Sequence, residues 1–162
     1  MNKQYTHYAD FDSAYGFATR AGFQLTALQI QDVEKFLTLD RALNTYEVGG
    51  GKTVLATVVA LMRGNSQKLV IVPPVLITPW VKWLIKVTDN VLLYRGDPRE
   101  RKELSIKKAH WIVMSHAIFR IDYKRIAYEV SDDLEIIVDE AHNLKNASSV
   151  LFKKVNQLCL GL

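Results

Sequence analysis

The turn Gly49-Gly50-Gly51-Lys52-Thr53 lies between a β-rich run, Ala42–Tyr46, and an apolar helical run that continues to Met62. Glycines allow backbone N–H groups to curl around phosphate oxygens, and the following helix adds its positive N-terminal end. In such a loop Lys52 would reach the β- and γ-phosphates of a nucleotide, and the Thr53 hydroxyl would bind Mg²⁺. The strand–turn–helix order therefore predicts a phosphate-binding loop.

Tyr46 departs from the full phosphate-loop pattern G-x-x-x-x-G-K-[ST], because it stands where that pattern has its first glycine. The alternative interpretation is a glycine-rich turn that only caps the next helix. The predicted strand and helix on either side favour phosphate binding, because the loop requires that setting.

A second chemical signal lies far downstream, where the predicted strand Glu135–Val138, with its apolar run 136–138, leads into Asp139 and Glu140. Such a strand places both carboxylates at the carboxyl edge of a parallel sheet, where ligands of open α/β folds bind. Asp139 would hold Mg²⁺ directly or through water, and Glu140 would orient the water that attacks the γ-phosphate. Two acids after a strand most often form a solvated turn, but the upstream loop favours a nucleotide site. We expect Lys52 and Asp139 to meet across adjacent strands.

The whole chain alternates β-rich runs with helical patterns, which predicts an α/β fold with a mostly parallel central sheet and helices on both faces. The expected strands are Ala42–Tyr46, Lys68–Val72, Val91–Tyr94, Trp111–Ser115 and Glu135–Val138. Helical patterns cover the segments 53–62, 119–130 and 150–158. A further helical face is formed by Ile30, Val33, Phe36 and Leu37, with Thr26 as a possible N-cap. Residues 1–22 show no clear periodicity and are expected to form an N-terminal arm.

Composition limits the class of protein. The chain has 162 residues, 49% of them hydrophobic, with 21 Lys and Arg against 17 Asp and Glu, which suits one globular domain and permits a polyanionic partner. Its single cysteine excludes an internal disulfide. The longest uncharged stretch, Leu69–Val81, is too short to span a bilayer, and no secretory signal is visible. We expect no membrane partner and a cytoplasmic protein, in the host-cell cytoplasm if the source is viral.

The segment 23–162 resembles the first RecA-like ATPase domain of superfamily-two helicases, and most of all the Swi/Snf-like branch with its DEAH box. Residues 46–53 are similar to that branch's Asp-Glu-Met-Gly-Leu-Gly-Lys-Thr. Residues 139–146 are similar to its Asp-Glu-Ala-His box and the Lys-Asn pair that follows. Residues 25–30 are similar to its Leu-Arg-Pro-Tyr-Gln-Leu segment, whose glutamine recognises adenine. The resemblance implies ATP and Mg²⁺ as cofactors, with a site made of Gln29, Gly49, Gly50, Gly51, Lys52, Thr53, Asp139, Glu140 and His142.

The remaining motifs of the family contact nucleic acid, and the resemblance places four residues of this chain there, namely Pro73, Trp80, Arg95 and Ser115. Each also has a structural interpretation, since the proline and tryptophan could pack and the serine could cap a helix. The run Arg95–Lys108 contains six cations. Side chains of such a run either form a solvated helix face or contact DNA phosphates.

The resemblance implies the ATP-binding half of a helicase or translocase that couples ATP hydrolysis to movement on DNA. A second RecA-like domain would supply an arginine finger, so we expect the isolated domain to be weakly active or inactive. The family continues into a Thr-Gly-Thr-Pro motif where this sequence ends, so we expect a fragment cut before the domain's last strand. Two alternatives stay open. One is a non-hydrolysing module that binds nucleotide or DNA, and the other is a different P-loop phosphotransferase, such as a small-molecule kinase.

Overall fold

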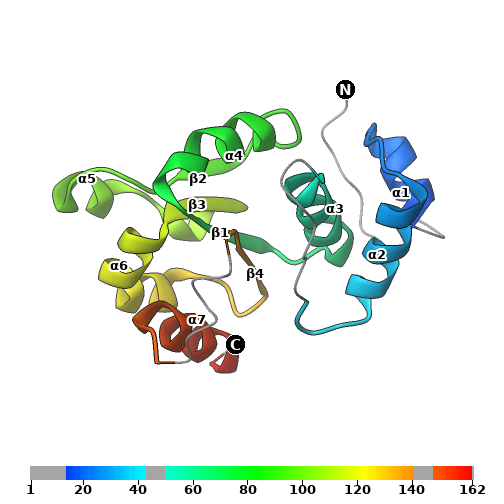
Figure 1. Cartoon of the computed structure of the whole chain (residues 1–162). Coiled ribbons are helices and arrows are strands. Elements are labelled where there is room, and N and C mark those ends of the chain that lie inside the picture. The colour runs from blue at the N-terminus through cyan, green and yellow to red at the C-terminus, as the bar shows by residue number, and fades with distance from the viewer. Residues whose placement is uncertain (1–13, 43–49, 141–147, 162) are drawn as a thin grey trace. The chain divides into compact units, whose positions relative to one another are not determined.

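The computed structural model describes residues 14–42, 50–140 and 148–161 (Figure 1). The chain divides between Asn65 and Ser66 into two compact units, each described here by itself. The predicted strand Ala42–Tyr46, apart from its first residue, lies outside the described residues, and so do Gly49 and His142.

The described part of the first unit consists of three helices: α1 (Ala14–Ala21), α2 (Ala27–Leu37) and α3 (Lys52–Arg63). Their shared core consists of buried residues from all three helices, namely Ala14, Val33, Leu55, Val58, Val59 and Met62. α1 belongs to the segment predicted as an arm, and its packing shows that this segment is helical from residue 14 onward. The Arg63 side chain connects α3 to the C-terminal end of α2. It donates hydrogen bonds to the carbonyl oxygens of Phe36, at 2.9 Å, and Leu39.

Local signals in the sequence explain where α2 and α3 begin and end. Thr26 is the N-cap of α2, and its hydroxyl accepts a hydrogen bond from the Gln29 backbone N–H at 3.2 Å. In return the Gln29 side chain accepts from the Thr26 N–H at 2.9 Å, which completes a capping box. α3 ends at Gly64, whose φ of 71° is readily adopted only by a residue without a Cβ. The Thr26 cap confirms the sequence-based expectation for the start of α2.

The second unit contains a four-stranded parallel sheet in the order β2-β3-β1-β4. Its strands are β1 (Gln67–Val72), β2 (Val91–Leu93), β3 (Trp111–Ser115) and β4 (Leu134–Val138). The four strands predicted for this part of the chain are confirmed, with ends that differ by one residue at most. Every residue of the two central strands, β1 and β3, is buried, as expected for apolar runs covered on both faces.

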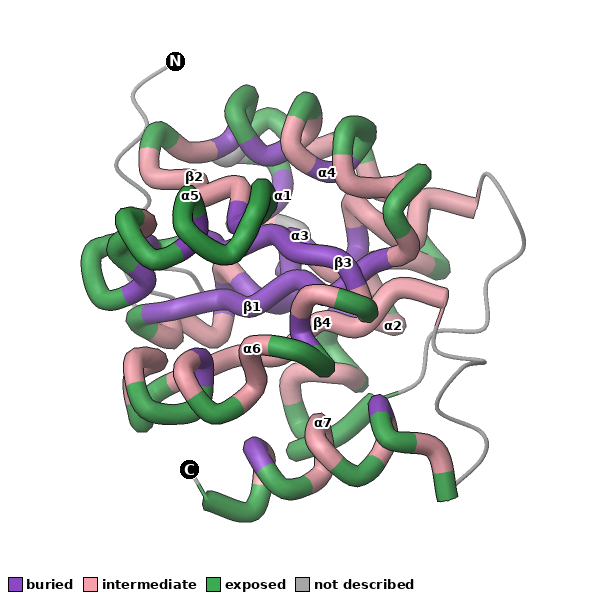
Figure 2. Tube along the Cα trace, turned by 90° about the vertical axis from the view of Figure 1, so that its left-hand side faces the viewer, coloured by how far each residue is buried: buried purple, intermediate pink, exposed green. Residues whose placement is uncertain are grey.

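Helices cover both faces of this sheet. α4 (Ile77–Leu84) lies on one face, whereas α6 (His116–Glu129) and α7 (Val150–Leu160) lie on the other, as Figures 1 and 2 show. Short 3₁₀ turns at Pro74–Leu76 and Ile106–Lys108 complete the connections, together with α5 (Pro98–Glu103). Each helix in the described residues is too short or too polar to cross a membrane.

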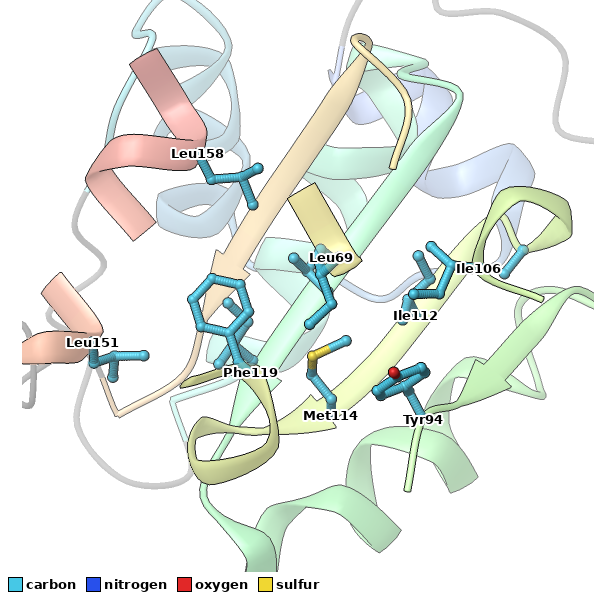
Figure 3. Close-up of a cluster of buried hydrophobic side chains, with 11 residues drawn as sticks. Leu69, Tyr94, Ile106, Ile112, Met114, Phe119, Leu151 and Leu158 are labelled. Carbon is cyan, nitrogen blue, oxygen red and sulfur yellow. The ribbon is translucent and has the colours of Figure 1, made fainter. Parts of the chain in front are cut away.

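The main core fills the space between the sheet and the helices α6 and α7 (Figure 3). Alternate residues of β1 and β3 point into it, and the helices contribute one aromatic ring and several aliphatic side chains. The fully or almost fully buried members are Leu69, Ile71, Tyr94, Ile106, Ala109, Ile112, Met114, Phe119, Ile126, Leu151 and Leu158. This core fixes the strand ends of the second unit, where the predicted acids lie.

The connection from β2 to β3 is held by a buried ion pair. The Arg101 side chain is 8% exposed, and its Nε donates to the Asp122 carboxylate on α6 at 2.7 Å. The Tyr94 hydroxyl donates to the same carboxylate oxygen at 2.8 Å. Arg101 belongs to the basic run 95–108, and its burial shows that this side chain does not lie on a solvated helix face.

Candidate functional site

The glycine turn (residues 49–53) is described from Gly50 onward, and its last two residues, Lys52 and Thr53, are the first residues of α3. Gly51 is the N-cap of this helix, and its φ of 82° lies in the left-handed region. As a glycine it has no side chain to cap the helix, and the first turn of α3 contains no acidic residue. Backbone N–H groups at an uncapped helix start bind anions well, because they are unsatisfied and the helix dipole is positive there. The described part of the turn therefore has the features of a phosphate site, with Lys52 as the first helical residue.

Gln29 lies against this turn. Its side-chain Nε2 donates to the Gly50 carbonyl oxygen at 3.0 Å, while its Oε1 accepts from the Thr26 N–H. The contact is tight, because a Cβ added at Gly51 would lie 2.5 Å from Gln29 Nε2. The structure thus brings the residue expected to read adenine together with the turn expected to bind phosphates. The Thr-x-x-Gln spacing of a capping box was a sequence signal for the fixed orientation of Gln29.

Asp139 directly follows β4 and extends its ladder with β1, because its N–H donates to the Ile71 carbonyl oxygen at 3.0 Å. Among the described residues, two groups donate hydrogen bonds to its carboxylate. The indole N–H of Trp80 donates to Oδ2 at 2.7 Å, and the Glu140 backbone N–H donates to Oδ1 at 2.8 Å. The side chain is therefore fixed at the carboxyl edge of the sheet, as predicted for this acid.

Glu140 has a left-handed backbone with φ of 55° and is the only non-glycine residue in the described part of the chain with a positive φ. A residue with a Cβ adopts this conformation at an energetic cost, and such residues often lie at functional sites. The backbone observation therefore fits the predicted role of Glu140 at the attacking water, a role that stays a prediction.

His116 lies next to Asp139, and no pattern in the sequence predicted this contact. Its Nε2 lies 3.2 Å from the Asp139 carbonyl oxygen. Burial lowers the pKa of His116 below 6.5, and this effect outweighs the opposing hydrogen bonds to the carbonyl oxygens of Asp139 and Ile71. The ring is therefore neutral at pH 7, and the carbonyl contact requires the hydrogen to be on Nε2.

The four predicted nucleic-acid contacts have different surroundings. Trp80 is 3% exposed and is bonded to Asp139. Ser115 is 5% exposed, and its hydroxyl caps α6 by accepting from the Ile118 N–H at 3.1 Å. The burial of Trp80 agrees with the packing given above as its alternative, and the Ser115 cap agrees with the alternative given for the serine. Pro73 is partly buried at the end of β1, and Arg95 is exposed after β2. DNA contact by these four residues stays a prediction.

The two described groups belong to different units: Gln29, Lys52 and Thr53 to the first, and Asp139 and Glu140 to the second. Within each unit the predicted residues are brought together. The expected meeting of Lys52 and Asp139 around one nucleotide stays a prediction.

Comparison with known proteins identifies the family. Residues 29–160 match the family model described as the SNF2-related domain. The chain belongs to this family.

Two relatives carry helicase names. The chain is 27% identical over 155 residues to the ATP-dependent DNA helicase DDM1 of Arabidopsis thaliana, covering 85% of this chain and 20% of that protein. It is 32% identical over 127 residues to YqhH, an uncharacterized ATP-dependent helicase of Bacillus subtilis, covering 73% of this chain and 21% of that protein. The chain thus spans about a fifth of the length of these relatives.

A solved structure shows the same fold. The SWI2/SNF2 ATPase core of Sulfolobus solfataricus, solved in complex with double-stranded DNA, matches with a TM-score of 0.68 and 22% identity. The match covers 83% of this chain and 30% of that one. The predicted α/β fold of a Swi/Snf-like ATPase domain is therefore confirmed.

Proposed function

We propose that this chain is the ATP-binding domain of a DNA-dependent ATPase, a helicase or translocase that couples ATP hydrolysis to movement on DNA. The observation that carries the proposal is the contact between Gln29 and the glycine turn, because it joins the predicted adenine reader to the predicted phosphate site in one unit. The SNF2-related family and the names of the two relatives support the same reading.

The residues of the chain suit the binding and hydrolysis of a nucleoside triphosphate. The open N–H groups at the start of α3 would bind phosphate oxygens, and the Lys52 ammonium would neutralise the β- and γ-phosphates. Glu140 would accept a hydrogen bond from the attacking water and orient it toward the γ-phosphate. A second RecA-like domain would complete the site with an arginine, as the resemblance implies.

The donor set fits Mg²⁺. Among the described residues, no group of three or more His, Cys, Asp and Glu side chains could hold a metal ion. Mg²⁺ in nucleotide sites commonly has one or two protein oxygens and completes its shell with phosphate oxygens and water. The Asp139 carboxylate and the Thr53 hydroxyl are hard oxygen donors of this kind and would hold it. When bound, the ion neutralises charge that develops on the phosphates.

Nucleotide-dependent stabilisation tests the site. A ligand present at about 100 times its Kd adds about 2.7 kcal/mol to the free energy of unfolding, so Mg-ADP should raise the melting temperature of the chain. Lys52→Ala and Asp139→Ala should each abolish this increase, whereas Lys153→Ala, at an exposed position on α7, should retain it. An unchanged increase in both site variants would remove Lys52 and Asp139 from the nucleotide site.

DNA is the proposed partner, and the exposed cations of the run 95–108 support it. These are Arg95, Arg99, Lys102, Lys107 and Lys108. Phosphate contacts by such side chains make the affinity for DNA fall steeply with salt. Replacing Arg95 and Arg99 by alanine should weaken binding to a duplex and reduce the salt dependence, and the control Arg120→Ala on α6, also exposed, should not. Equal affinities of the wild-type chain, the Arg95/Arg99 double variant and Arg120→Ala for the duplex would contradict this interface.

A further inference from the structure

We infer that Trp80 is a positioning residue that holds the Asp139 carboxylate in the orientation needed to bind Mg²⁺ with nucleotide. The inference rests on the proposed function and links Trp80 to Asp139, the proposed Mg²⁺ ligand in the second unit. The observation behind it is the 2.7 Å hydrogen bond from the Trp80 indole N–H to Asp139 Oδ2.

The fold of the second unit places Trp80 beside Asp139. β1 and β4 are parallel neighbours with Ile71 opposite Val138, so the chain leaves both strands at the same edge. After β1 the prolines at 73 and 74 turn the chain into α4. Trp80, in the middle of this helix, is 3% exposed, and its N–H reaches the first residue after the neighbouring strand.

The remaining contacts of Asp139 restrict its main chain and its second carboxylate oxygen, Oδ1. Its N–H is bonded to Ile71, its carbonyl oxygen contacts His116, and its Oδ1 accepts from the Glu140 N–H. Oδ2 is fixed by Trp80. Each carboxylate oxygen can accept more than one hydrogen bond, so the indole orients the group and leaves acceptor capacity for a metal ion or its bound water.

Tryptophan suits this task for a chemical reason. The indole N–H donates and cannot accept, so it can only pair with an acceptor such as the carboxylate. Its ring is rigid and buried, which keeps the donor in place. Outer-shell partners of metal-binding carboxylates commonly change metal affinity about 10- to 100-fold when they are removed.

The hydrogen bond can be tested directly by NMR, because the chain has three tryptophans, and Trp80→Phe identifies the Trp80 indole resonance by its loss. Asp139→Asn should shift this resonance and leave those of Trp83 and Trp111 in place. An unshifted Trp80 resonance would overturn the inference. This measurement needs no nucleotide and keeps Trp80 intact.

The function of the contact is tested by the Mg²⁺ dependence of ADP-induced stabilisation. Trp80→Phe keeps an aromatic ring but removes the donor, and we expect it to raise the Mg²⁺ concentration for half-maximal stabilisation about 10-fold or more. The matched control Trp83→Phe, on the same helix, should not change it. If Trp80→Phe lowers the melting temperature but leaves the Mg²⁺ concentration for half-maximal stabilisation unchanged, Trp80 has only a structural role and the inference is wrong.

The outcomes separate the inference from the proposed function. If Mg-ADP stabilises the wild-type chain through Lys52 but Trp80→Phe leaves the Mg²⁺ dependence unchanged, the inference is wrong and the proposed function stands. If Mg-ADP gives no Lys52-dependent stabilisation of the wild-type chain, the proposed function fails, and the inference fails with it.

Discussion

Gly51→Ala perturbs the glycine turn at the point where its geometry is tightest. An alanine at φ of 82° costs about 1 to 2 kcal/mol, because the Cβ is too close to the following carbonyl oxygen. The new Cβ would also lie 2.5 Å from Gln29 Nε2, which displaces that side chain and breaks its bond to Gly50. A lost hydrogen bond of this kind costs about 0.5 to 1.5 kcal/mol.

The two effects together lower the free energy of unfolding by about 1.5 to 3.5 kcal/mol. Urea denaturation followed by circular dichroism measures this change. Gly64→Ala is the matched control, because Gly64 has a φ of 71° at the other end of the same helix, so it should show only the backbone cost.

A double-mutant cycle isolates the contact. In a Gln29→Ala background the clash is absent, so Gly51→Ala should cost only the backbone amount of about 1 to 2 kcal/mol. If Gly51→Ala and Gly64→Ala cost the same, and the cycle shows no coupling with Gln29, the reasoning about the turn is refuted.

Further predictions concern the second unit. Asp122→Ala leaves the Arg101 guanidinium buried without its carboxylate and should lower the free energy of unfolding by about 3 kcal/mol, measured by urea denaturation. Replacing Arg101 and Asp122 together should cost less than the sum of the losses measured for the two single variants. Burial opposes ionisation of Asp122, but hydrogen bonds from Arg101 and Tyr94 prevail and hold its pKa below 3.8. Because the folded chain then binds fewer protons, this contribution is complete above pH 4 and is lost as the pH falls through the lowered pKa. Acid denaturation of Asp122→Asn should lack this component, and an identical acid profile would contradict the assignment. Ser115→Ala removes the α6 cap and should cost about 1 kcal/mol, while Ser115→Thr should retain most of that stability; equal losses in both would show that the hydroxyl does not cap.

The strands of the second unit and its helices α6 and α7 could be predicted because their signals are local. Apolar runs such as Leu69–Val72 fill a buried parallel strand, and the predicted ends agree with the structure. α5 is not among the predicted helices, although the sequence contains a local signal for it. Asp97, Pro98 and Glu100 form a capping box with proline at the first helical position.

The side-chain partners could not be predicted in the same way. Arg101 reads as one more exposed cation in a basic run, but it pairs with Asp122 on another helix. Trp80 reads as packing or as a DNA contact, but its N–H reaches Asp139, which is 59 residues away. Such contacts depend on which strands become neighbours, and periodicity contains no information about strand order.

The left-handed backbone of Glu140 sets stability against activity at one position. Glycine there would relieve the strain, since it adopts a positive φ without a Cβ clash. Glu140→Gly would therefore favour the folded backbone and at the same time delete the carboxylate proposed to orient water. A directed-evolution screen for heat resistance alone would enrich changes at residue 140, and a screen for ATP turnover would remove them.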